Sequence, residues 1–206
     1  MTGYIFMAVL LAVTSLYYVA NCLVGGYPVF GAILSSVYFV LLIIVPVLTM
    51  RSMAEEKRQK TDQLLMTAPV SLWKIVLGKY LAMVTVFLIP MAILCLYPLI
   101  LLRFGSVSLT MAYTAILGYT LFGAACLAIG LFLSAVTESQ VIAAVLTFGV
   151  LFFLNMASGI ANVIGASGLL ASILNALCIY QPFINFVQGM FDLTGILYYM
   201  TVIVLA

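Results

Sequence analysis

Long apolar runs, separated by short polar segments, dominate this chain. Five runs, at about 3–24, 30–50, 75–102, 109–135 and 140–157, approach or exceed the ~20 residues that a helix needs to cross the hydrocarbon core. A sixth begins near Gly195 and stops at Ala206, and we expect the chain to be trimmed at both ends, with 195–206 a truncated span. The pattern predicts an all-α polytopic membrane protein, with six transmembrane helices in a single transmembrane domain over residues 1–206.

Two of these runs carry features that predict their packing. Pro90 and Pro98 both lie in the third run, and because proline lacks the amide hydrogen, we expect this helix to be kinked or interrupted. The fourth run is rich in small residues, which let membrane helices approach one another closely. We expect the fourth helix to pack against its neighbours through Gly123, Ala124, Ala128, Gly130 and Ser134.

One polar segment, residues 51–79, carries nine of the twelve charged residues. Wound as a helix, 51–68 places Glu56 four residues before Lys60, which favours ion pairing, and gathers apolar side chains on another face. Pro69 ends this helix. The segment predicts an amphipathic helix that either rests on lipid headgroups or docks a cytoplasmic partner. Its mixed charges favour docking, because a headgroup-binding helix would be mostly basic.

The basic residues also predict the orientation, since they favour the cytoplasmic side of a membrane. Six of the seven Lys and Arg residues lie within 51–79. We therefore expect this segment and the N terminus to be cytoplasmic, and 25–29, 103–108 and 158–194 to be external. Glu138 is then cytoplasmic, and we interpret it as a turn residue rather than as a partner of the charged segment.

Residues 158–194 form an apolar segment broken by glycine and amide residues. Such backbone must be buried in protein, line a cavity or lie at the interface, so we expect one or two short re-entrant or external helices. The polar side chains either line a path or external gate, or form hydrogen bonds between helices, and the sequence leaves both open. For Asp192 a helix cap is favoured over a gate. The residues concerned are Asn155, Asn162, Asn175, Asn185, Gln188 and Asp192.

Composition narrows the class of function. Charged residues make up 6% of the chain and hydrophobic ones 67%, whereas soluble domains carry about a quarter charged residues. Membrane orientation explains why the basic residues are clustered, so the sequence gives no support for nucleic-acid binding. Histidine is absent and the four cysteines are far apart, so we expect neither a metal site nor a cofactor in this chain. A membrane-embedded enzyme would need a nucleophile–base pair that the sequence does not offer.

Two stretches of sequence carry a resemblance to a known family. The first is AEEKRQKTDQLLMTAPVSLWKIVLGKY at residues 54–80, which resembles the signature of ABC-2 type permeases of ABC transporters. The second is LNALCIYQPFINFVQGMFDLTGILYY, which is similar to the subgroup of gliding-motility and copper-maturation permeases. Two residues depart from the pattern, because Lys60 replaces the usual glycine and Gln63 the usual acid. The basic amphipathic helix expected before the first span is also absent.

The resemblance implies a mechanical function in the cell inner (cytoplasmic) membrane. Two permeases, identical or related, face each other, each with a cytoplasmic ABC ATPase subunit that binds ATP and Mg. The helix between spans two and three sits in a cleft of the ATPase and acts as a lever, and export is the outcome we expect from the family. The alternative is a membrane anchor that docks a cytoplasmic protein without transport. The chain has no G-x-x-x-x-G-K-[ST] phosphate loop, so we expect no enzymatic activity of its own. The docking residues are Glu55, Glu56, Lys57, Arg58, Lys60, Thr61, Asp62, Leu64 and Leu65.

Overall fold

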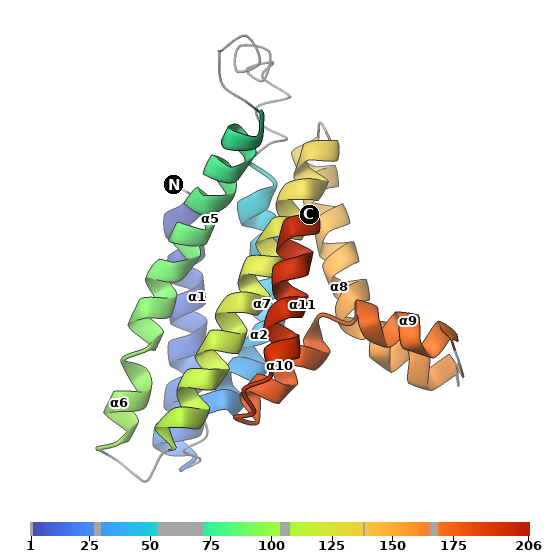
Figure 1. The fold of residues 1–206 in the computed structure, drawn as a ribbon. Helices are drawn as coiled ribbons and strands as arrows, with labels where there is room; N and C mark the ends of the chain where they lie inside the picture. Colours follow the sequence, from blue (N-terminus) through green and yellow to red (C-terminus); the bar gives the residue numbers. More distant parts are fainter. Residues whose placement is uncertain (1, 27–29, 53–71, 104–107, 138, 165–168) are drawn as a thin grey trace.

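The computed structural model describes residues 2–26, 30–52, 72–103, 108–137, 139–164 and 169–206 (Figure 1). All regular elements in these residues are helices, which confirms the all-α prediction for this part of the chain. The elements are α1 Thr2–Tyr18, a π-helical continuation η1 Val19–Val24, α2 Phe30–Thr49, α5 Leu72–Leu94, α6 Tyr97–Leu101, α7 Leu109–Val136, α8 Gln140–Ile164, α9 Leu169–Leu177, α10 Tyr180–Val187 and α11 Leu193–Leu205.

Five helical stretches are long and apolar enough to cross a membrane. They are Thr2–Cys22, Phe30–Thr49, Trp73–Leu101, Leu109–Val136 and Gln140–Ile160. The sixth expected span corresponds to α11, an apolar helix of 13 residues, which is shorter than the ~20 residues that a perpendicular crossing needs. Length and composition thus support five of the six predicted spans among the described residues.

The third span is interrupted where its two prolines lead us to expect a break. Helix α5 ends at Leu94 and α6 begins at Tyr97. Pro98 has no amide hydrogen and cannot donate to the carbonyl of Leu94, so the helical hydrogen-bond ladder has a gap at this turn. Pro90, by contrast, is accommodated within α5. The last part of this span, α6, is therefore a separate short helix.

Helix α7 lies at the centre of the bundle. It packs against α2, α5, α8, α10 and α11, and Figure 1 shows it running among them. Two of its aromatic side chains, Tyr119 and Phe122, are fully buried, and each lies near the ring of Phe183 from α10. The buried core of the molecule is thus built around one helix.

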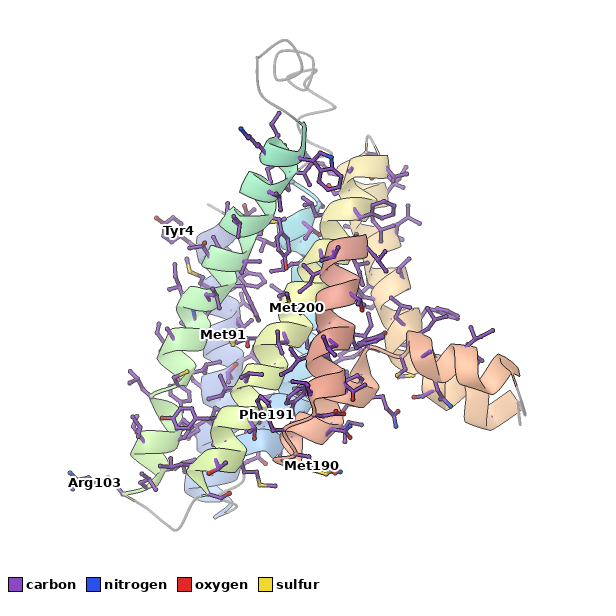
Figure 2. All side chains as sticks on the ribbon, viewed as in Figure 1. Tyr4, Met91, Arg103, Met190, Phe191 and Met200 are labelled. Atoms are coloured by element: carbon purple, nitrogen blue, oxygen red, sulfur yellow. The ribbon has the colours of Figure 1, made fainter. Side chains whose placement is uncertain are left out.

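The two ends of the bundle carry different segments. One end has the start of α1, the end of α2, the start of α5, the end of α7, the start of α8 and the end of α11 (Figure 1). The opposite end has the end of η1, the start of α2, Arg103 and the turn from α10 to α11 (Figures 1 and 2). The helix ends that border the segments expected on the cytoplasmic side, from the distribution of basic residues, thus lie at the same end of the bundle.

The end of the fifth span differs from the expected one. Helix α8 runs to Ile164, whereas the sequence predicts the end of this helix at residue 157 and irregular backbone from residue 158. Gly159 weakens a helix by only about 1 kcal/mol relative to alanine, which does not break a long apolar helix. Beyond it, α9 and α10 are two short helices of 9 and 8 residues, too short to cross the bilayer.

Candidate functional site

Glycines of α7 bring neighbouring helices into direct contact with its backbone. At Gly130, an added Cβ atom would lie 2.7 Å from the Oγ1 atom of Thr49 on α2. Gly123 faces the ring of Phe87 on α5, and Gly118 faces Phe186 on α10, both too closely for any side chain. Among the other predicted packing residues, Ala128 and Ser134 are buried and Ala124 is half-buried. Helices α2, α5 and α10 therefore each approach the backbone of α7 at a glycine.

Polar contacts join α2, α5 and α7 near the end of the bundle where α5 begins. The Nζ atom of Lys79 donates a hydrogen bond to the backbone carbonyl of Ser52, 3.3 Å away, just after α2. The hydroxyl of Tyr80 donates to the carbonyl of Ala124 on α7 at 3.2 Å. These bonds hold the two helix ends that border residues 53–71 against the central helix. The predicted docking residues 55–65 themselves lie outside the described residues.

A small pocket lies at the opposite end, where α9, α10 and α11 meet. Its volume is about 180 Å³. It brings together three of the residues that the sequence suggests for a path or gate: Asn175, Asn185 and Asp192. Ala176, Cys178, Gln181, Pro182, Thr194, Gly195 and Tyr198 also line it. Polar groups from three successive helices thus lie in one site whose wall is otherwise apolar.

Local capping explains why the chain turns sharply here. Helix α10 ends at Val187 with Gln188 as its C-cap, and the following residue, Gly189, has a φ of 80°, a conformation that glycine adopts without strain. The amide of Met190 donates to the carbonyl of Asn185 and that of Gly189 to Phe186, the pattern of a Schellman motif. Asp192 then caps α11 by accepting a hydrogen bond from the amide of Thr194 at 2.9 Å. The favoured interpretation of Asp192 as a helix cap agrees with this contact.

Asp192 also holds the two helices together. Its Oδ2 atom accepts a hydrogen bond from Nδ2 of Asn185 on α10 at 3.2 Å. That bond, followed by the backbone bond from Thr194, lowers the pKa of the Asp192 carboxyl below its usual value. The side chain remains ionised at neutral pH, and the pocket therefore carries a negative charge.

Comparison with known families identifies the chain. The sequence model described as ABC-2 family transporter protein matches residues 25–205. The chain belongs to the ABC-2 transporter family. It is accordingly a multi-pass integral membrane protein and the membrane domain of an ABC transporter. No match was found among curated proteins or among solved structures.

Two other predicted path residues of this ABC-2 protein, Asn155 and Gln188, are not among the residues that line the pocket. Asn155 on α8 is 7% exposed, and its Nδ2 atom donates to the carbonyl of Leu151 while Oδ1 has no partner among the described residues. Gln188 is exposed at the end of α10. The side chain of Asn162 lies outside the described ones. Of the five predicted path residues whose side chains are described, three therefore line the pocket and two do not.

Sequence reasoning missed the residues that fix this end of the ABC-2 protein. The thiol of Cys178 lies 3.7 Å from the carbonyl of Asn155 and 3.4 Å from the hydroxyl of Ser158, which ties the start of α10 to α8. The hydroxyl of Tyr199 donates to the carbonyl of Ile179 at 2.8 Å. Tyr180 stacks on Tyr38 of α2, with ring centroids 4.4 Å apart. Only the aromatic and cysteine content of 178–199 signalled such packing in the sequence.

Proposed function

We propose that this chain is the permease subunit of an ABC exporter, driven by a separate cytoplasmic ATPase subunit that docks on residues 51–68. The main support for this proposal is that the chain belongs to the ABC-2 family. In this proposal, residues 51–68 form the coupling helix, and ATP and Mg bind to the ATPase rather than to this chain. The protein lies in the cell inner membrane with its N terminus and residues 51–79 in the cytoplasm.

The packing of α7 supports a mechanical role for the segment. Residues 53–71 connect two helix ends that are tied together through Lys79 and Ser52. A force applied to that segment acts on α2 and α5, and both of these helices meet α7 at glycines. Because these glycine contacts leave no free space, a shift of either helix toward α7 would displace α7 in this proposal. Helix α10 also meets α7 at a glycine, which would carry the motion to the opposite end.

The assembly that fits this proposal contains two permeases and two ATPase subunits. The described helices of one subunit pack around a central helix, so in this proposal the path forms between two facing subunits, identical or related. The tail 174–199 resembles the gliding-motility and copper-maturation permeases, and we place the chain in that subgroup. The alternative function is a membrane anchor that holds a cytoplasmic protein without moving a substrate.

Charge reversal on the coupling segment tests the docking step. We expect the double substitution Glu55→Lys and Glu56→Lys to lower co-purification with a co-expressed ATPase subunit at least several-fold, because like charges oppose each other at the former contacts. Added lysines favour the cytoplasmic side, so membrane insertion should be preserved. Arg103→Glu, a charge reversal at the opposite end, is the control and should leave association unchanged. Equal association of the native protein and the double variant contradicts the proposal.

A probe at the opposite end separates transport from anchoring. Met190 is 55% exposed beside the α10–α11 turn (Figure 2). A fluorophore attached at Met190→Cys, in a variant whose four native cysteines are replaced, should report an ATP-dependent change in the complete complex. An unchanged signal during measured ATP hydrolysis supports the anchor function instead.

A further inference from the structure

The pocket between α9, α10 and α11 combines side chains that recognise a positively charged group. Its lining includes Asp192, Tyr198 and three residues with side-chain amides, Asn175, Gln181 and Asn185. Amide oxygens accept hydrogen bonds from N–H donors. None of the described residues that line the pocket is Lys or Arg. The chemistry of the lining therefore suits a cation better than an anion.

The negative charge of the Asp192 carboxylate has no positively charged partner among the groups that bond to it. Its Oδ1 atom accepts a hydrogen bond from the amide of Thr194 and its Oδ2 atom from the side chain of Asn185. The hydroxyl of Thr194 and the amide of Gly195 also contribute to lowering the pKa of this carboxyl. All of these groups are neutral, so none of them balances the charge. A cation at this position would neutralise the site.

Tyr198 adds a second attraction for a positively charged group. Tyr198, on the helix that Asp192 caps, lines the pocket together with that carboxylate. A cation over an aromatic face is attracted by the negative face of the ring, and such contacts are strengthened where water is partly excluded. The volume of about 180 Å³ is below the range of drug-sized sites, which begins at about 300 Å³. The pocket accordingly fits one small head of a ligand rather than a whole large molecule.

We propose that the pocket lined by Asp192 and Tyr198 binds a single ammonium group. A primary ammonium would donate hydrogen bonds to the Asp192 carboxylate and to the amide oxygens, while the Tyr198 ring covers its alkyl side. The ammonium group belongs either to the headgroup of an aminophospholipid or to a soluble amine. The site goes beyond the proposed coupling to an ATPase, because binding here requires neither nucleotide nor a second subunit.

The surroundings of the pocket are compatible with both sources of the ammonium group. Met190, Phe191 and Leu193, on either side of Asp192, are 55%, 62% and 65% exposed. Figure 2 shows Met190 and Phe191 at the α10–α11 turn, at the end of the bundle that also carries Arg103. Exposed apolar side chains beside a polar pocket would lie at the boundary between lipid and water. A lipid headgroup and a dissolved amine both have access to such a position.

Two binding measurements on the purified full chain separate the sources. For the lipid, native mass spectrometry compares retention of phosphatidylethanolamine and phosphatidylglycerol with identical acyl chains. For the soluble amine, ethanolamine is titrated calorimetrically into protein held in nanodiscs of phosphatidylglycerol alone. Preferential retention of phosphatidylethanolamine supports the lipid headgroup, and saturable ethanolamine binding supports the soluble amine.

Three sites of substitution test whether the binding occurs at this pocket. Asp192→Asn removes the charge but keeps a good helix cap, and we expect it to weaken ammonium binding about ten-fold or more. Tyr198→Leu should weaken it about two- to five-fold, whereas Tyr198→Phe retains the ring and most of the affinity. Arg103→Gln, which removes an exposed charge at the same end, should leave binding unchanged. Thermal unfolding of each variant verifies that it is folded.

Two results overturn the proposal. One is the absence of selective binding in both measurements with the native protein. The other is the same affinity for the native protein and for folded Asp192→Asn. Neither result bears on association with an ATPase, which the Glu55 and Glu56 variant measures separately, so the two proposals fail independently.

Discussion

Gly130 of α7 lies directly against the side chain of Thr49 near the end of α2. A Cβ atom at Gly130 would stand 2.7 Å from Oγ1 and 2.8 Å from Cγ2 of Thr49, which is itself fully buried. The Thr49 hydroxyl is held by a hydrogen bond to the carbonyl of Val45, so its rotamer is fixed. Close approach of these helices therefore depends on the absence of a side chain at residue 130.

We expect Gly130→Ala to destabilise the protein by about 1–3 kcal/mol, because the added methyl group must displace a buried, β-branched side chain. Thermal unfolding in detergent measures the loss. Gly149→Ala is the matched control, since nothing among the described residues lies within 4 Å of a Cβ atom there. That variant should be neutral or slightly more stable, because alanine favours the helix. Equal effects at the two glycines would contradict the interpretation of this contact.

A double substitution tests whether the two residues interact directly. Thr49→Ala makes room beside residue 130, so the combined variant Thr49→Ala with Gly130→Ala should be more stable than the sum of the two single effects predicts. The expected coupling is about 0.5–3 kcal/mol, the range for residues in contact. Strictly additive changes in the free energy of unfolding would mean that the strain from the methyl group added at residue 130 is relieved elsewhere.

The bond from the Tyr199 hydroxyl to the Ile179 carbonyl should matter for stability. Tyr199 is fully buried, and the O···O distance is 2.8 Å. Tyr199→Phe leaves a buried carbonyl without this partner, and we expect a loss of about 1 kcal/mol. Tyr4→Phe, at a side chain that is 77% exposed, is the control. If Tyr199→Phe lowers the free energy of unfolding no more than Tyr4→Phe does, the hydrogen bond makes no net contribution to stability.

The lowered pKa of Asp192 predicts a pH dependence of stability. A carboxyl whose pKa is lower in the folded state stabilises the fold above its unfolded pKa, and this contribution disappears as the pH falls through the folded value. Stability of the native protein relative to Asp192→Asn should therefore be greatest near neutral pH and decrease below about pH 4. Comparing the two proteins cancels the titration of the other carboxyls. A difference that does not change between about pH 7 and about pH 3 would contradict this expectation.

Cysteine labelling tests the proposed orientation in the membrane. In a variant without the native cysteines, a membrane-impermeant maleimide should modify Ser106→Cys from outside intact cells. The same reagent should modify Gln59→Cys only after the membrane is opened. The reason is the concentration of basic residues in 51–79, which favours the cytoplasmic side. The reverse labelling pattern would show that the orientation is the opposite of the proposed one. An ATPase would then have to dock at the other end of the bundle.

Much of the secondary structure could be predicted from the sequence. The expected starts and ends of the first four spans agree with the observed helices within about three residues, because apolar runs and prolines act locally. The end of α8 could not be placed, since the sequence suggested a break near Gly159 and the helix continues to Ile164. A single glycine costs a helix only about 1 kcal/mol relative to alanine, which is too little to end it.

The sequence by itself determined that this protein is a helical membrane protein, and its charged segment pointed to the family that the comparison shows. Only the tertiary structure decided that α7 is central and that Asp192, Asn185 and Tyr198 share one pocket. The physical reason is that lipid is as apolar as the protein core, so hydrophobicity marks which residues form spans but not which faces point inward. Contacts between helices, made at glycines, tyrosines and caps, provide that information.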